Sequence, residues 1–241
     1  ICTHIRKHIE LGMRLFQLFV LLSCFFTSED LLAQDSLVAS SYFKQANSDL
    51  METENDGNRI VLMGNSITQG WPDQHPDFFY DSPYINRGIS GQTTSEMLLR
   101  FQQDVVDLEP SIVVILAGTN DIAQNRGPVT IDQIAQNIFS MVEMSQENNI
   151  EVVLCSVLPA YQFPWRPQLE PAEQVLALNE QLRTYAEEQQ IVYVDYHTAM
   201  MNDVHGMKEE LAYDGIHPNT AGYLVMEPLL EAGISTILDQ Q

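Results

Sequence analysis

The chain has 241 residues, with 33 aspartate and glutamate side chains against 11 lysine and arginine side chains, and a formal net charge of −22. This length is enough for one domain with a substantial core, and nothing in the sequence requires a second domain. The acidic balance argues against nucleic acid as a partner, because binding to a phosphate backbone depends on cationic side chains.

The first 34 residues are typical of a leader with a signal peptide. An apolar segment at 15–26 follows basic residues and is too short to span a bilayer comfortably. We expect cleavage near Ala33 and an exported protein, periplasmic or extracellular, in which residues 35–58 form an N-terminal arm. A lipid anchor on Cys24 is an alternative with a weaker sequence match. Cys155 would then be the one cysteine of the mature chain, so no intramolecular disulfide is expected.

Residues 59–241 form the predicted domain, in which apolar strands alternate with helices. The runs that predict strands are 59–63, 84–89, 112–117, 151–157 and 191–196. Five β/α units in succession predict an α/β fold, a three-layer α/β/α sandwich with a five-stranded parallel sheet. No further membrane-spanning segment is expected in the mature domain.

Helix starts are predicted by local signals between these strands. Thr93 with Glu96, and Thr130 with Gln133, have the spacing of capping boxes. Pro171 occupies a favoured first-turn position. A last helix follows residue 218, and Pro228 should bend or interrupt it.

Polar residues that suit nucleophilic catalysis follow the strands. The turn after the first strand presents the hydroxyl of Ser66, Gly91 follows the second strand, and Asn120 follows the third. Asp214 and His217 come after the fifth. Because the carboxyl ends of parallel strands meet at one edge of a sheet, we expect these residues to converge there. A nucleophilic serine needs a base, a carboxylate partner for the base, and donors for an oxyanion, and each role has a candidate.

Each signal also has a simpler structural interpretation. Asn65 or Ser66 could cap the following helix, Asn120 with its neighbour could do the same, and Asp214 with His217 could form a surface turn. The convergence of all of them on one predicted edge favours a functional site.

The other sequence features have fewer implications for chemistry. His75, His197 and His205 lack a carboxylate at the same three-residue spacing and are interpreted as structural. The sequence contains no glycine-rich phosphate loop and no metal-ligand spacing of cysteines and histidines, so neither a cofactor nor a metal is expected.

Four blocks, in order and spacing, resemble those of the SGNH hydrolases, the GDSL lipase/esterase superfamily. They are Gly64-Asn65-Ser66-Ile67-Thr68, Ser90-Gly91-Gln92-Thr93-Thr94, Gly118-Thr119-Asn120-Asp121 and Asp214-Gly215-Ile216-His217-Pro218. The resemblance covers about residues 59 to 235 and implies a flavodoxin-like fold.

The same resemblance implies the roles of individual residues. Ser66 would be the nucleophile, His217 the base and Asp214 its partner. The oxyanion donors would be the amides of Ser66 and Gly91 and the side chain of Asn120. One departure is Asn65, which stands where the family usually has an aspartate. That aspartate is not a triad member, so the change concerns how the turn is held.

The leading functional hypothesis is an exported serine esterase that cleaves small acyl esters, above all acetyl esters of carbohydrates. Alternatives are a lysophospholipase, a thioesterase or a lipid hydrolase like platelet-activating-factor acetylhydrolase, and a different class is a non-catalytic carbohydrate- or lipid-binding module. Trp71, Tyr161, Phe163 and Trp165 lie in loops above the predicted edge. Such residues either pack internally or stack on a sugar ring. The expected partner is a small ester or an acylated carbohydrate, and the oligomeric state is not predicted.

Overall fold

The structure of the chain is a computed structural model that describes residues 41–55 and 57–239. The predicted leader, the cleavage region around Ala33 and Cys24 lie outside these residues. The unit that begins at Phe43 carries all the elements described below.

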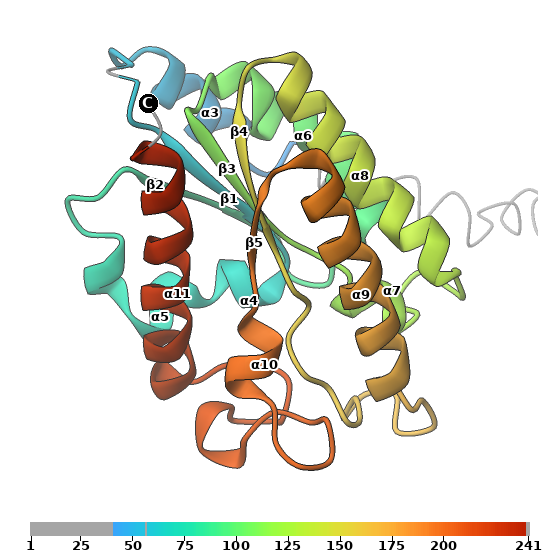
Figure 1. Cartoon of the computed structure of the whole chain (residues 1–241). Coiled ribbons are helices and arrows are strands. Elements are labelled where there is room, and N and C mark those ends of the chain that lie inside the picture. The colour runs from blue at the N-terminus through green and yellow to red at the C-terminus, as the bar shows by residue number, and fades with distance from the viewer. Residues whose placement is uncertain (1–40, 56, 240–241) are drawn as a thin grey trace, which may run out of the picture. The chain divides into compact units, whose positions relative to one another are not determined.

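A parallel sheet forms the middle layer of this unit (Figure 1). Its strands are β1 (Ile60–Gly64), β2 (Tyr84–Gly88), β3 (Ile112–Leu116), β4 (Glu151–Cys155) and β5 (Val192–Val194). They are arranged in the order β2-β1-β3-β4-β5. This is the flavodoxin-like order, and it confirms the predicted α/β fold with five parallel strands.

Helices cover both faces of the sheet. The longer ones are α3 (Lys44–Met51), α6 (Thr94–Asp104), α8 (Ile131–Glu147), α9 (Ala172–Gln189) and α11 (Thr220–Leu238). The short ones are α4 (Ser66–Gln69), α5 (Trp71–Gln74), α7 (Thr119–Ile122) and α10 (Tyr196–Met200), with 3₁₀ turns η1 (Pro76–Phe78), η2 (Val106–Leu108) and η3 (Glu209–Leu211).

The strands are apolar throughout because both of their faces are buried. Val61 and Met63 of β1 belong to the core that α6, α8 and α9 cover. Ile60 and Leu62 point to the opposite face and belong to the core beneath α11. Alternate side chains of each strand thus belong to two different cores. The sequence therefore shows continuous apolar runs instead of a polar–apolar alternation.

The predicted helix starts are largely confirmed. Capping boxes of Thr93 with Glu96 and of Thr130 with Gln133 begin α6 and α8. Pro171 is the residue just before α9 rather than a member of its first turn.

Of the two outcomes predicted for Pro228, a bend or an interruption of the last helix, the interruption is wrong, since α11 runs through it from Thr220 to Leu238. The bend stays a prediction. Proline removes the hydrogen bond to the carbonyl four residues earlier, that of Leu224. Both residues are exposed, so the break in the hydrogen-bond ladder faces solvent.

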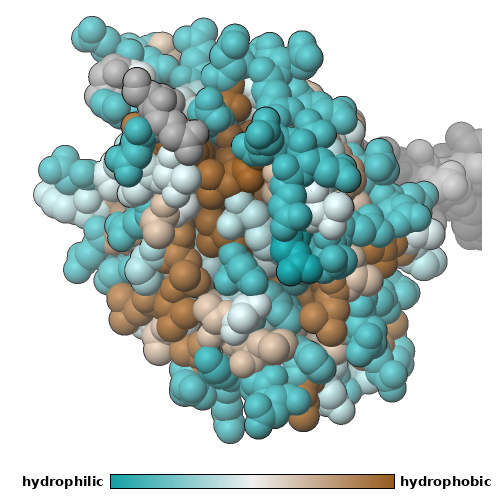
Figure 2. All heavy atoms as spheres, viewed as in Figure 1, coloured by the Kyte–Doolittle hydropathy of each residue, from teal (hydrophilic) through white to brown (hydrophobic). Residues whose placement is uncertain are grey.

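Helix α11 is long and apolar enough to cross a membrane by length and composition. In this structure it packs on the sheet, and Gly233 lets it approach β5 so closely that an added Cβ would lie 2.7 Å from Val194. Figure 2 shows hydrophilic residues over much of this face, with apolar ones gathered near the middle, between α11 and α9. The helix therefore serves as a core helix of this fold.

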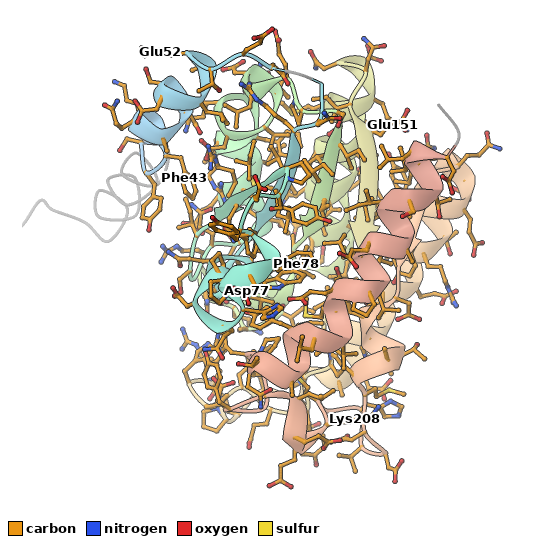
Figure 3. The ribbon with its side chains drawn as sticks, turned by 90° about the vertical axis from the view of Figure 1, so that its left-hand side faces the viewer. Phe43, Glu52, Asp77, Phe78, Glu151 and Lys208 are labelled. Carbon is orange, nitrogen blue, oxygen red and sulfur yellow. The ribbon has the colours of Figure 1, made fainter. Side chains whose placement is uncertain are left out.

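Helix α3 lies within the predicted arm and packs near η2 at one end of the domain. Phe43 immediately precedes it (Figure 3). Its Leu50 contacts the core beneath α6. This part of the arm is thus packed onto the domain.

Candidate active site

Ser66 is the first residue of α4, immediately after the turn that ends β1. The side-chain oxygen of Asn65 accepts a hydrogen bond from the amide of Ile67 at 3.1 Å. Asn65 therefore caps α4, as the simpler interpretation of this turn expected, while the hydroxyl of Ser66 is bonded elsewhere. Asparagine and aspartate both cap by accepting through a side-chain oxygen, which explains how Asn65 holds this turn.

The side chains of Ser66, His217 and Asp214 form one hydrogen-bonded chain. The hydroxyl oxygen of Ser66 lies 3.0 Å from Nε2 of His217. Nδ1 of the same imidazole lies 2.7 Å from Oδ2 of Asp214. The structure thus brings together three of the predicted site residues from opposite ends of the domain sequence.

The environment of Asp214 determines which nitrogen of His217 carries the proton. Burial raises the pKa of Asp214, but hydrogen bonds from the amide and imidazole of His217 and from the amide of Ile216 outweigh it, so the pKa lies below its ordinary value. The ionised carboxylate can only accept, so Nδ1 of His217 must donate to it. Nε2 is then free to accept the proton of the Ser66 hydroxyl.

Contacts between α11 and α4 hold the His217 loop next to Ser66. The hydroxyl of Tyr223, in the first turn of α11, donates to the carbonyl of Ile67 at 2.6 Å. Gly222 lets the loop approach α11, since an added Cβ would lie 2.2 Å from the carbonyl oxygen of Leu211. The distance between Ser66 and His217 is therefore set by packing between the first and last β/α units.

Besides the amide of Ser66, the candidate oxyanion donors are Gly91 and Asn120, whose segments are joined by a hydrogen bond. Gly91 has a φ of +79°, a conformation that favours glycine. The side-chain amide of Asn120 donates to the carbonyl of Gln92 at 2.9 Å, and its oxygen accepts from Asn125 at 2.9 Å. These two bonds orient the amide and leave its second N–H as a further donor. The structure brings Asn120 against the residue that follows Gly91.

Of the loop aromatics, two are packing residues and two are exposed. Trp71 is 2% exposed and Phe163 is 0% exposed, so of the two interpretations given for these residues, internal packing holds for both. Trp165 is 40% exposed, with its ring centroid 6.0 Å from that of His217. Tyr161 is also exposed but has no ring contact with His217 that the structure records.

Sequence reasoning missed Tyr213 and Asn125. The ring of Tyr213 stacks on that of His217, with centroids 5.7 Å apart and an interplanar angle of 9°, and is 66% exposed. Its position directly before Asp214 was the available signal. Asn125 accepts a hydrogen bond from the indole of Trp165 at 3.2 Å and donates to Asn120, a link that no sequence pattern indicates.

The other histidines in the part of the chain that the structure describes, His75, His197 and His205, lie outside this chain of hydrogen bonds. His75 bonds the buried carboxylate of Glu227 at 2.8 Å. His205 contacts the sulfur of Met201, and the backbone amide of His197 donates to Ser156. The side-chain contacts of His75 and His205 agree with their interpretation as structural residues, whereas Nε2 of the His197 imidazole is buried with no hydrogen-bond partner among the described residues.

Residues 62–225 match the GDSL-like lipase/acylhydrolase family. The chain belongs to this family. Solved structures agree: a GDSL-like lipase from Bacteroides thetaiotaomicron is 41% identical, with a TM-score of 0.79, over 82% of this chain and 98% of its own. A candidate acylhydrolase from Bacteroides fragilis is 42% identical, with a TM-score of 0.79, over 81% of this chain and 95% of its own.

Curated relatives match the GDSL domain over smaller shares of their length. An acetylxylan esterase of Xylanibacter ruminicola is 23% identical over 74% of this chain and 43% of its own length. An uncharacterized lipoprotein of Bacillus subtilis is 36% identical over 78 residues, so the match spans about a third of that protein. Taken with the family, the relatives named esterases make this domain a hydrolase that acts on ester bonds.

The GDSL domain also contains a buried carboxylate next to Asn120. Both oxygens of Asp121 accept from the amide of Thr94, at 3.1 and 2.9 Å, and Oδ1 accepts from its hydroxyl at 2.7 Å. Asp121 thus holds the start of α6, which follows the Gly91 loop. Burial nevertheless raises its pKa to about 6, because it outweighs these hydrogen bonds.

This raised pKa predicts a pH-dependent contribution to stability. The folded state binds the Asp121 proton more tightly than the unfolded state. Protonation of Asp121 therefore stabilises the fold fully below pH ~4, and this contribution is lost as pH rises to about 6. Since one pKa unit corresponds to ~1.4 kcal/mol, the unfolding free energy of the wild type should fall relative to Asp121→Asn by on the order of 3 kcal/mol between pH 4 and 7.

Urea unfolding of both proteins at each pH unit in this range measures the difference. Asp203→Asn, in an exposed loop, reports the effect of losing one surface carboxylate. A wild-type stability that rises with pH relative to Asp121→Asn would contradict the assignment.

Proposed function

We propose that this domain cleaves small acyl esters, chiefly acetyl esters of carbohydrates, with Ser66 as nucleophile. The observation that carries the proposal is the hydrogen-bonded chain from the Ser66 hydroxyl through His217 to Asp214, with distances of 3.0 and 2.7 Å. This arrangement supplies a base for the serine and an anion that stabilises the base once it is protonated.

In the proposed reaction, Nε2 of His217 takes the Ser66 proton while the serine oxygen attacks the carbonyl carbon of the ester. The amides of Ser66 and Gly91 and the side chain of Asn120 stabilise the oxyanion. The intermediate collapses, the C–O bond to the alcohol breaks, and His217 protonates the leaving oxygen. Water, deprotonated by His217, then attacks the acyl carbon, the bond between this carbon and the Ser66 oxygen breaks, and His217 returns the proton to Ser66 as the carboxylic acid leaves.

Two features support a carbohydrate acceptor. Relatives of this chain include acetylxylan esterases, such as that of Xylanibacter ruminicola. The exposed rings of Trp165 and Tyr213 flank His217, and rigid aromatic faces at a site entrance suit stacking on sugar rings.

We also propose that the protein is exported. The basic and apolar residues of the first 34 positions support this, as does the likeness to a Bacillus lipoprotein. Fractionation of a tagged chain that contains residues 1–241, compared with the same chain without residues 15–26, tests the proposal.

Replacement of the triad residues tests the mechanism. Ser66→Ala and His217→Ala should each lower kcat on the order of 10⁶-fold, and the double variant should be no slower, because the pair acts as a unit. Asp214→Asn should cost about 10⁴-fold, and Asn120→Ala about 10²–10³-fold. The assay is hydrolysis of p-nitrophenyl acetate together with labelling by a fluorophosphonate, which requires an activated serine.

Ser235→Ala and His205→Ala are matched controls, since both residues are exposed and lie outside the hydrogen-bonded chain. They should retain full activity. Labelling of Ser66→Ala at the wild-type rate would reject Ser66 as the nucleophile.

The acyl pocket should be short. Ile67 is buried, and the rings of Trp71 and Tyr223, whose centroids are 5.0 Å apart, occupy the core beneath α4. An open apolar groove would raise kcat/KM about fourfold for each methylene, since burial of one is worth ~0.8 kcal/mol. We expect kcat/KM instead to decline from p-nitrophenyl acetate through butyrate to octanoate, measured below their micellar limits. A steady increase would favour a lipase or lysophospholipase.

The exposed aromatic rings should bind the acceptor rather than the acyl group. Loss of one stacked ring costs ~0.5–1.5 kcal/mol, so Tyr213→Ala should raise KM for an acetylated xylooligosaccharide about 2–12-fold. Tyr213→Phe keeps the ring and should resemble the wild type. The control is Tyr80→Ala, an exposed tyrosine before β2 and hence at the opposite edge of the sheet. An equal rise in KM for p-nitrophenyl acetate would exclude a role of Tyr213 in acceptor binding.

A further inference from the structure

A buried polar network lies behind the proposed oxyanion loop. Its centre is Arg100 of α6, which is 0% exposed. Nε of Arg100 donates to Oε1 of Gln92 at 2.6 Å, and one terminal nitrogen donates to the carbonyls of Gly64 and Arg87, at 3.1 and 2.9 Å. One guanidinium therefore joins the residue after Gly91 to the end of β1, two residues before Ser66.

The network continues from Arg100 to helix α3. The other terminal nitrogen of Arg100 donates to Asp104 at 3.0 Å, and the side-chain amide of Asn47 donates to the second oxygen of Asp104 at 2.6 Å. Asn47 also accepts from Nε of Arg87 at 2.9 Å. The guanidinium of Arg87 lies 4.6 Å from the ring centroid of Phe43, which precedes α3 (Figure 3).

These charges are costly to bury. Burial lowers the pKa of Arg87 to about 10 and also lowers that of Arg100, while the Asp104 carboxylate opposes both shifts. Well-packed apolar residues often replace a buried ion pair without loss of stability. Stability alone therefore does not account for this network, whose directional hydrogen bonds link the loop that contains Gln92 to the end of β1.

We propose that Arg100 is a positioning residue that holds the 90–92 loop against the end of β1, and that Asn47 extends this support to α3. The carbonyl of Gln92 accepts from Asn120, so a shift of this loop would displace both Gly91 and Asn120 from Ser66. The inference rests on the proposed function, in which these residues supply oxyanion donors. Helix α3 lies outside the matched segment 62–225, so this support is additional to the family match.

Two substitutions at Gln92 separate positioning from packing. Gln92→Met removes the oxygen that Arg100 bonds at nearly constant size, and should lower kcat about tenfold, less than the ~10²–10³-fold cost of removing a donor itself. KM should stay unchanged. Gln92→Glu keeps an acceptor oxygen and should recover most of kcat. The Gln92→Glu substitution breaks no hydrogen bond, because Nε2 of Gln92 has no hydrogen-bond partner among residues 41–55 and 57–239.

Affinity for phenylboronic acid, which forms a tetrahedral adduct with an activated serine, gives an independent measurement. It should fall in parallel with kcat in Gln92→Met, since both depend on the oxyanion donors. A purely structural role would lower the melting temperature and leave kcat and this affinity unchanged well below the transition. That result would overturn the proposal.

Asn47→Ala tests the contribution of α3 and keeps the proposal testable if Gln92→Met does not fold. It should lower kcat in the same direction as Gln92→Met, without a change in KM. Gln45→Ala is the matched control, because Gln45 is exposed on the same helix and bonds Asp49 within it. An unchanged kcat in a folded Asn47→Ala variant would show that α3 does not help to position the loop.

The same assay distinguishes failure of this inference from failure of the proposed function. An active Ser66→Ala would reject the nucleophile and with it the oxyanion loop. An inactive Ser66→Ala beside a fully active Gln92→Met would reject the positioning role alone.

Discussion

The pairing register of β1 with its two neighbours is the constraint on which the site depends. Gly64 lies opposite Gly88 of β2 on one side and Leu116 of β3 on the other. The loops that carry Ser66, Gly91 and Asn120 therefore start at the same level of the sheet. A shift of one residue in either strand would move a loop by about 3.3 Å, more than a hydrogen bond tolerates.

Glycine at the end of β2 belongs to this constraint. An added Cβ at Gly88 would lie 2.2 Å from the backbone nitrogen of Gln69 in α4. Since backbone atoms cannot move aside as a flexible side chain can, only glycine lets α4 pack this closely on β2. The amide of Ser90 then donates to the side chain of Gln69 at 2.8 Å, which joins the second loop to the helix that begins with Ser66.

The sheet and the convergence of the site could be predicted from the sequence because both follow from local patterns. Apolar runs give the strands, and parallel topology places the ends of those strands at one edge. The fate of the aromatic residues could not be predicted in this way. Trp71 packs against Tyr223 of the last helix, and Glu227 of the same helix satisfies its buried indole N–H by accepting it at 3.0 Å. Phe163 and Trp165 share one loop, yet packing from other segments buries the first and leaves the second exposed.

The burial of the charged residues of α6 could not be predicted from the sequence either. Arg100 and Asp104 are four residues apart, a spacing that is typical of an ion pair on an exposed helix face. Their burial depends on Asn47 and Arg87, which come from α3 and β2. Partners so distant along the chain leave no periodic signal in the helix itself.

The Ser66–His217 pair can form only late in synthesis, because the two residues are 151 positions apart. During synthesis or translocation the first β/α unit emerges early, but its serine then has no imidazole beside it. The His217 loop is held by α11, whose Tyr223 bonds the carbonyl of Ile67, so the last helix must emerge and dock before the Ser66–His217 pair exists. A nascent chain whose α11 has not yet docked lacks this pair, so under the proposed mechanism its ester hydrolysis begins only after the C-terminal segment has folded onto the domain.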